Sequence, residues 1–202
     1  AQDDFEIDVG TAIDRGLAWM DTNGGFNAVP AGNRSGIGLR ALALLEKHVG
    51  NDPDQPVQGY ALASAADKAR IDNLINYIKA NHVGAGNYAY RDGSDLMALS
   101  VYLRTGGLDP AGVTAAIQTI FDRVATYQSA QGYWCYSNAG CDDSSTTQLV
   151  MAGLASARGV FSDAGEAWAD AARLATLNTL TASARTGYVD FATTGGAGGV
   201  LE

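Results

Sequence analysis

The sequence predicts an all-α fold in a single domain of 202 residues, and three observations support this prediction. Apolar residues recur at helical spacing in successive segments, as Ile71, Leu74 and Ile78 do in the third segment. Glycine and proline separate the segments, for example at Gly24-Gly25 and between residues 50 and 59. No stretch alternates apolar and polar residues as a half-buried β-strand does.

Each segment has its own helical signals. The second segment, residues 37–49, has few polar residues on any side, so we expect a buried helix there. Pro110 suits the first turn of the fifth helix, where its fixed φ is already helical and its missing N–H is not needed. The tail over residues 193–200 is rich in glycine and ends before another helix could form. The expected helices cover residues 9–20, 37–49, 61–81, 94–106, 110–127, 144–157 and 164–181.

The composition excludes two classes of partner. Apolar residues make up 47% and charged residues 17% of the chain, which is typical of a globular protein rather than a disordered one. The net charge of −9 argues against a nucleic-acid partner, because a surface that follows phosphates needs clustered Lys and Arg. No apolar run approaches the roughly 20 residues that a bilayer span requires, so we expect no membrane span.

Two features favour a secreted or periplasmic location. The chain begins Ala1-Gln2-Asp3-Asp4, which is typical of a mature N-terminus left by signal peptidase. Its two cysteines, Cys135 and Cys141, are separated by five residues in a loop. A short-loop disulfide is the favoured interpretation, and two free thiols are the alternative.

A helical-hairpin unit recurs along the chain and is best preserved from Gln128 to Gln148. Each copy has a moderately polar helix, a Gly-x-aromatic turn, a small polar helix cap and then an apolar helix. In the third copy these are Gln128, Gly132 and Trp134, with a cap at residues 142–144. The corresponding residues are Gly24 and Phe26 with cap 33–35 in the first copy, His82, Gly86 and Tyr88 with cap 92–95 in the second, and Gly187 and Val189 with residues 193–194 in a partial fourth.

These residues resemble the prenyltransferase and squalene-oxidase repeat, whose hallmark turn is Gln-x-x-x-Gly-x-Trp. The third copy matches that turn in full, and Arg15-Gly16-Leu17-Ala18-Trp19-Met20 matches the usual upstream half. The resemblance covers roughly residues 12–189. It implies an α/α toroid or partial toroid, in which polar outer helices surround apolar inner ones. In that family the turn lies outside the ring and joins neighbouring repeats.

The turn residues are therefore expected to be structural. Glycine permits the chain reversal, the aromatic ring is buried under the next repeat, and the glutamine bonds free backbone groups at helix ends. The chain holds about three and a half copies, whereas closed toroids of this kind have about six. It is either a fragment of a larger ring or a half-ring that pairs with another copy, because an uncapped stack leaves an apolar face exposed.

Inner helices of such a ring are parallel, so their N-termini gather at one opening, which we call the mouth. Two interpretations of its polar residues stay open: they cap helices and oppose the helix dipoles, or they form a ligand site. The cap residues Asn33, Arg34, Ser35, Ser94, Ser144 and Ser145, with Tyr90 nearby, share this opening. The candidate ligand-binding residues of the mouth are Asp92, Asp95, Asp142, Asp143, Tyr136 and Arg91.

The residues of the mouth fit some chemistries better than others. A squalene–hopene-type cyclase uses an Asp-x-Asp-Asp acid, but here Gly140 replaces the first aspartate and aromatic residues are few. A prenyltransferase-like zinc site lacks ligands in separate repeats, because both cysteines share one loop and the only histidines are His48 and His82. A calcium site from Asp92, Asp95, Asp142 and Asp143 is possible, since hard oxygen ligands are plentiful, although no EF-hand spacing occurs.

The favoured hypothesis is a secreted repeat domain with a binding or assembly role. Its acidic mouth would hold a small ligand, a cation, a glycan or a partner segment, and its open repeat edge would contact a second copy or the remainder of the ring. The alternatives are a polysaccharide hydrolase or lyase, which would recruit Asp95 with Asp142 or Asp143, and a degenerate terpenoid cyclase.

Overall fold

The computed structural model describes residues 4–27, 36–83, 86–137 and 141–194, and side chains as far as residue 190. This part of the chain is all-α, as predicted: it contains no β-strand, only isolated bridges such as Gln128 with Trp134. Its elements are α1 (Asp4–Thr22), α2 (Ile37–Leu45), the short 3-10 helix η2 (Val49–Asn51), α3 (Ala65–Asn81), α4 (Ala89–Arg104), α5 (Pro110–Thr126), α6 (Ser144–Phe161) and α7 (Ala171–Thr194).

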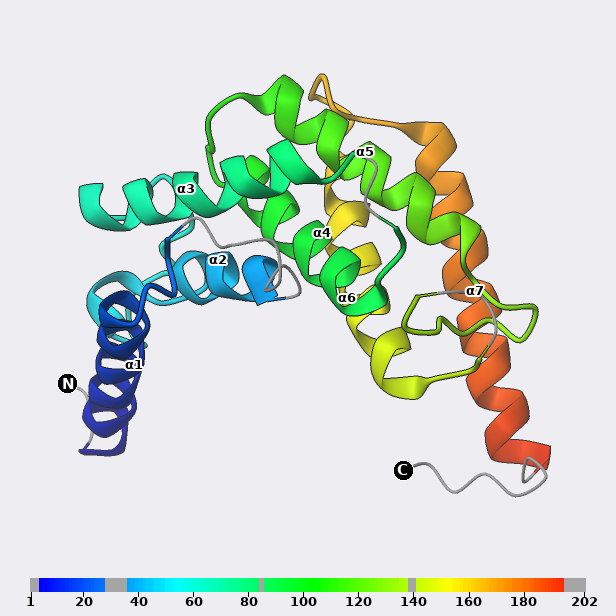
Figure 1. Ribbon diagram of the computed structural model, residues 1–202, viewed down its shortest axis with the longest axis horizontal. Helices are drawn as coiled ribbons and strands as arrows, with labels where there is room; N and C mark the ends of the chain where they lie inside the picture. Colours follow the sequence, from blue (N-terminus) through cyan, green and yellow to red (C-terminus); the bar gives the residue numbers. More distant parts are fainter. Residues whose placement is uncertain (1–3, 28–35, 84–85, 138–140, 195–202) are drawn as a thin grey trace.

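The helices lie in two rows along an open arc (Figure 1). The inner row is α2, α4 and α6, and α4 at its centre packs most extensively against the other two. The outer helices follow the same order, with α3 against α2, α5 against α4, and α7 against α6. Helices α1 and α7 lie at opposite ends of the arc (Figure 1). The described residues therefore form successive helical hairpins but do not close a ring.

Two glycines set the spacing of the inner row. A Cβ atom on Gly38 would lie 2.4 Å from the Ser94 carbonyl, and one on Gly93 would lie 2.4 Å from the carbonyl oxygen of Leu149. No side chain fits at either crossing, so the helix backbones touch. Gly93 follows Gly38 by 55 residues, and Leu149 follows Ser94 by the same 55. The same helix crossing thus recurs along the chain.

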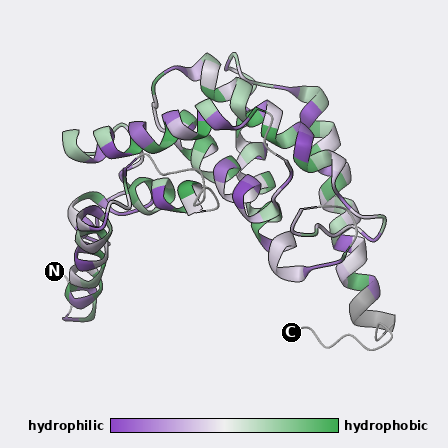
Figure 2. Ribbon diagram, viewed as in Figure 1, coloured by the Kyte–Doolittle hydropathy of each residue, from purple (hydrophilic) through white to green (hydrophobic). Residues whose placement is uncertain are grey.

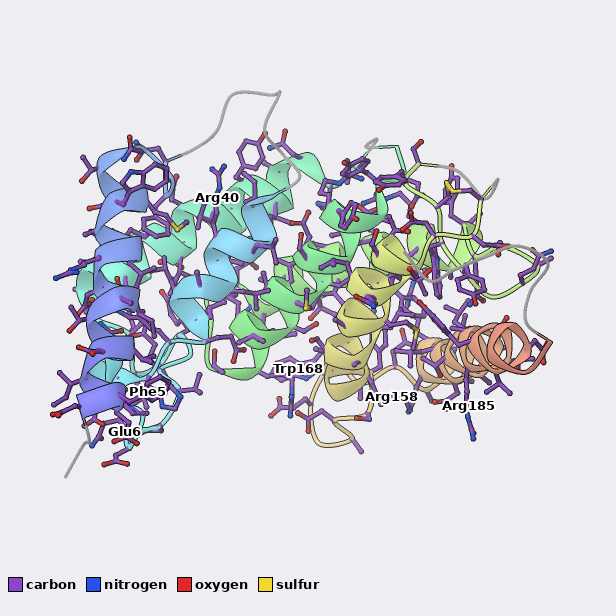
Figure 3. All side chains as sticks on the ribbon, turned by 90° about the horizontal axis from the view of Figure 1, so that it is seen from below. Phe5, Glu6, Arg40, Arg158, Trp168 and Arg185 are labelled. Carbon is purple, nitrogen blue, oxygen red and sulfur yellow. A yellow bond between two sulfur atoms is a disulfide. The ribbon has the colours of Figure 1, made fainter. Side chains whose placement is uncertain are left out.

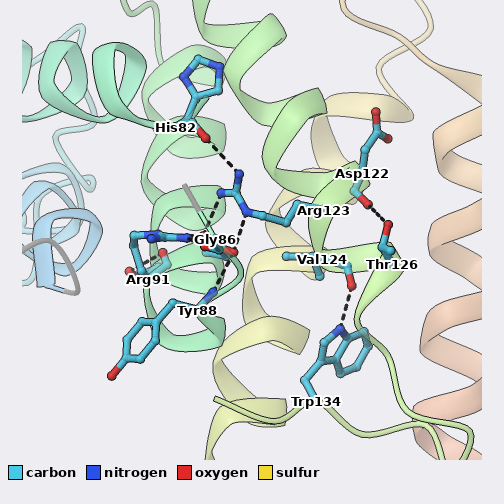
Figure 4. Close-up of polar contacts among 11 residues, drawn as sticks. His82, Gly86, Tyr88, Arg91, Asp122, Arg123, Val124, Thr126 and Trp134 are labelled. Atoms are coloured by element: carbon cyan, nitrogen blue, oxygen red, sulfur yellow. Dashed lines mark hydrogen bonds and ion pairs between the residues drawn. The ribbon is translucent and has the colours of Figure 1, made fainter. Parts of the chain in front are cut away.

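The turn over residues 128–134 follows α5 and contacts both α5 and α7. Trp134 is fully buried, and its Nε1–H donates to the Val124 carbonyl over 2.9 Å (Figure 4). Gln128 donates from Nε2 to the carbonyls of Gly132 and Leu180, both at 2.9 Å. The turn therefore ties the end of α5 to the backbone of α7.

The corresponding turn of the second copy does not have this geometry. Gly86 is exposed, has no close neighbour for a Cβ atom and is not among the glycines with positive φ, whereas φ is 92° at Gly132. Tyr88 is half-buried, whereas Trp134 is fully enclosed. His82 follows α3, and its Nδ1 lies 2.7 Å from the Lys79 carbonyl.

Two predicted helix boundaries are wrong, each because of a glycine. Helix α4 begins at Ala89 and not near Ser94, so residues 92–95 lie inside its first two turns; Gly93 serves the crossing with α6 and not a loop. Helix α7 runs from Ala171 to Thr194 instead of 164–181, so Gly187 is not a turn. A Cβ atom on Gly187 would lie 2.1 Å from the Gln131 carbonyl oxygen, so close packing explains this glycine too.

Other boundaries shift by a few residues. Helix α1 begins at Asp4, five residues before the predicted start. Helix α2 ends at Leu45, because the chain turns into η2, where Gly50 has a φ of 65°. Helix α3 begins at Ala65, after Ser64 caps it by accepting the Asp67 N–H.

We expect Trp134→Ala to lower the free energy of unfolding by roughly 3–5 kcal/mol, since it removes a fully buried ring and a buried hydrogen bond. Chemical denaturation followed by circular dichroism measures the change. Leu62→Ala is the control, because Leu62 is 57% exposed and its truncation should cost far less. Equal losses in the two variants would show that the turn does not hold α5 and α7 together.

Candidate functional site

The first turns of α2, α4 and α6 lie side by side. Gly38 touches the backbone of Ser94, and the Tyr90 hydroxyl is 2.5 Å from Ser145 Oγ. The Tyr136 ring packs edge-on against Tyr90 with centroids 5.4 Å apart, and its carbonyl accepts the Ala89 N–H. The structure thus brings residues of the mouth together on three helix starts. The predicted cap Asn33-Arg34-Ser35 lies outside the described residues.

Asp92 is completely buried and accepts hydrogen bonds from two arginines. Arg123 of α5 donates through Nε and Nη2, each at 2.9 Å, and Arg91 donates through Nε at 2.8 Å. Arg123 also donates from Nη1 to the His82 carbonyl, 2.9 Å away, at the end of α3. This ion cluster joins α3, α4 and α5. Its carboxylate is committed to the fold and is not offered to a ligand.

The two aspartates before α6 also have partners. Asp143 is the N-cap of α6, as predicted, and its carboxylate accepts the Thr146 N–H at 2.8 Å. Burial opposes ionisation of Asp143, but hydrogen bonds from Thr146 and Ser145 outweigh it and lower its pKa. Asp142 accepts the Ser129 hydroxyl at 2.7 Å. Asp143 therefore caps α6, and Asp142 binds the turn that follows α5.

The predicted cysteine pair lies in the same loop. Cys135 and Cys141 are bonded, with Cα atoms 5.1 Å apart. The bond closes the loop between Trp134 and the cap Asp143. It therefore restrains the approach of the turn to the start of α6.

Asp95 differs from the other carboxyl groups. Its side chain is 5% exposed, and Oδ1 has no hydrogen-bond partner among the described residues. Burial, and next the charge of Asp92, raise its pKa to about 8, against the lowering influence of Arg91, Arg123 and the Gly38 N–H. Asp95 is therefore a neutral carboxylic acid at neutral pH, held inside the protein.

Asp95 lines a small pocket between α2, α3 and α4. The pocket and the open space in front of it together measure about 260 Å³, and the space accessible to a water-sized molecule has room for about one water. Its apolar walls are Ile37, Tyr77 and Ile78. Its polar groups come from Asn81, His82, Arg91 and Asp95.

The sequence interpretation missed the central residue of the ion cluster, Arg123. Nothing local marks it, since a single arginine in the last turn of a helix is usually a solvated cation near the dipole. It also missed Thr146 and Thr147, which are buried and bond the Trp134 carbonyl and N–H. The T-T pair after an aspartate cap was the available signal for these two.

No family model, curated protein or solved structure matches this chain. Among the described helices, none combines the length and hydropathy needed to cross a bilayer. The described residues also contain no group of three or more His, Cys, Asp or Glu side chains arranged to hold a metal ion. The calcium site considered from Asp92, Asp95, Asp142 and Asp143 therefore has no supporting geometry.

We expect Asp95→Asn to stabilise the protein relative to wild type, by an amount that grows from about pH 4 to about pH 8 and is constant above. The raised folded-state pKa means that native Asp95 keeps a proton that the unfolded chain has released, so wild-type stability falls across this window. Denaturation midpoints over a pH series measure the difference. A stability difference that does not change with pH would show that Asp95 is ionised in the folded state.

We expect Asp92→Asn to lower the free energy of unfolding by roughly 3–5 kcal/mol, because Arg91 and Arg123 lose their buried counter-ion. Asp142→Asn is the control on an exposed carboxylate and should stay within about 0.5 kcal/mol of wild type. Urea denaturation compares the two. If both variants are equally stable, the ion cluster does not hold the helices together.

Proposed function

We propose that this chain is an exported helical-repeat domain, a partial α/α toroid, with an assembly role. The observation that carries the proposal is the exposed apolar side of α1 at one end of the arc. We propose that a second copy of the chain covers this side. The disulfide supports an exported protein, because such bonds persist in oxidising compartments.

The apolar side of α1 follows a helical stripe. Residues 5, 9, 13, 16 and 19 fall on one side of a helix with 100° between residues, and four of them are large and apolar. Phe5 is 75% exposed, and Val9, Ile13 and Trp19 are exposed as well. Gly16 has no neighbouring atom within 4 Å of a Cβ position. We call residues 5, 9, 13, 16 and 19 the α1 stripe.

Helix α1 makes few contacts with the rest of the protein. Gly10 is its one buried residue, where a Cβ atom would lie 2.8 Å from the Asn51 carbonyl oxygen. Leu17 and Met20 pack partly against the core, and Asp21 pairs with Arg70 at 2.7 Å. Apolar and polar residues mix along the whole helix (Figure 2). Because helices owe most of their stability to a packed apolar face, the α1 stripe is suited to a further contact.

Charge favours α7 of a second copy as the occupant over a second α1. Helix α1 carries five acidic residues and one arginine, a net charge of −4, so two α1 stripes face to face would repel. Helix α7 carries Arg173, Arg185 and Asp190, a net charge of +1. Arg185 lies at the end of the molecule opposite Phe5 (Figure 3). A head-to-tail contact would also continue the row of helices.

The enzyme alternatives have less support. A hydrolase or cyclase would need its acid in a groove that admits a sugar ring or a polyene. Asp95 is the neutral acid of the mouth, but the accessible space in its pocket has room for about one water molecule. Asp92, Asp142 and Asp143 are each held by hydrogen bonds within the protein.

We expect the protein to self-associate at micromolar concentration, and Phe5→Gln with Trp19→Gln to shift it to monomer. Light scattering across a concentration series measures the mass. Leu108→Gln is the matched control, because Leu108 is also an exposed apolar residue but lies between α4 and α5. Arg185→Glu should weaken the head-to-tail contact, whereas pairing of two α1 stripes would not respond to it. A wild-type monomer at all concentrations would overturn the proposal.

A further inference from the structure

Three tyrosine rings contact one another at the mouth. The Tyr90 ring is the middle one, with its centroid 5.4 Å from that of Tyr136 and 6.3 Å from that of Tyr88. Tyr136 is 44% exposed, and the other two are half-buried, so the three rings offer aromatic surface to a ligand. The Tyr88 side chain points away from Arg123 (Figure 4). We call Tyr88, Tyr90 and Tyr136 the tyrosine row.

A chain of hydroxyl groups lies along the polar side of this row. The Ser145 hydroxyl donates to the Asp143 carboxylate over 2.7 Å. Because a serine has one O–H, the 2.5 Å contact between the Tyr90 and Ser145 hydroxyls is a hydrogen bond that Tyr90 donates. Both protons are thus directed toward Asp143, and both oxygens keep a lone pair that can accept. The row therefore combines aromatic faces with hydrogen-bond acceptors, and it suits a ligand that carries hydroxyl donors.

A neutral sugar has both complementary features. The C–H groups on the face of a hexopyranose pack on the negative face of an aromatic ring, and hydroxyl groups surround the same sugar ring. In a β-linked glucan all ring substituents are equatorial, so each face of the sugar presents C–H groups alone. Flat, exposed rings suit such a chain better than a sugar with an axial hydroxyl group.

The row is less suited to a charged ligand. An aromatic cage holds a quaternary ammonium ion between rings that face it. Tyr90 and Tyr136 instead contact each other edge-on, which leaves no space between them for an ion. An anionic sugar would approach Asp142 and Asp143 on a chain whose net charge is −9.

We propose that the tyrosine row binds a neutral β-linked glycan, whose sugar rings pack on Tyr136 and its neighbours and whose hydroxyl groups donate to the oxygens of Tyr90 and Ser145. The row shares no residue with the α1 stripe, so this binding does not depend on the assembly role. It also needs no catalytic acid, because Asp143 stays the cap of α6.

Cellohexaose is the probe, and chitohexaose tests the same chemistry with N-acetylated rings. Titration of the whole ¹⁵N-labelled protein should shift the amide resonances of Tyr88, Tyr90 and Tyr136 and saturate at millimolar sugar. Saturation by either β-linked hexasaccharide supports the proposal, and the comparison identifies the sugar. Maltohexaose, which is α-linked, and choline, which is cationic, should bind more weakly.

Two variants at Tyr136 separate the ring from its hydroxyl group. Tyr136→Ala removes the most exposed ring and should weaken binding roughly tenfold. Tyr136→Phe keeps the ring and should bind within roughly threefold of wild type. Circular dichroism should show both variants folded, because the hydrogen bond from the Ala89 N–H goes to the backbone carbonyl of residue 136. Trp19→Ala is the control at a distant exposed aromatic residue and should keep the wild-type affinity.

Three results would overturn the proposal. If neither β-linked hexasaccharide shifts these resonances at millimolar concentration, the tyrosine row is not a glycan site. Choline binding that exceeds sugar binding and disappears in Tyr136→Ala would make it a cation site. Sugar binding that survives in Tyr136→Ala but is lost in Trp19→Ala would place the glycan on the α1 stripe.

Discussion

The rest of the structure depends on the backbone contact of the inner helices at Gly38 and Gly93. At each crossing a single Cβ atom would overlap the next helix, so α2, α4 and α6 approach more closely than side chains would allow. The contact lies near the start of every inner helix. It therefore brings three helix N-termini together, and with them the polar residues that a helix start carries. The mouth is a consequence of where the glycines are placed.

The same contact explains why two carboxyl groups of one helix have opposite states. Asp92 and Asp95 lie three residues apart on α4, and the neighbouring helices bury both. Burying a charge is costly unless a partner compensates it, and Asp92 receives both Arg91 and Arg123. Burial of Asp95, and next the charge of Asp92, raise its pKa to about 8 and outweigh the lowering influence of Arg91, Arg123 and the Gly38 N–H. The two carboxyl groups of one helix therefore differ because the arginines bind only one of them directly.

Local patterns predicted the helices and the features that depend on near neighbours. Helical spacing predicted the seven α-helices that the described residues contain, and the acidic start of α6 correctly indicated the Asp143 cap. The sequence failed where one residue type has two uses. Gly93 and Gly187 look like turn glycines, but both sit inside helices where another backbone approaches. The partnership of Asp92 with Arg123 spans 31 residues and two helices, so no local pattern predicts it.

The centre and the ends of the arc obey different constraints, and this difference connects the fold to its proposed roles. Helix α4 is covered on both sides by α2 and α6, so its polar groups must be neutralised inside the protein. Helix α1 has a neighbour on one side only, and the large apolar residues of the α1 stripe are exposed. A repeat stack always produces these two environments, because an inner repeat has two neighbours and an end repeat has one. The central repeat must therefore compensate its buried polar groups internally, whereas the end helix is the place where we propose contact with another chain.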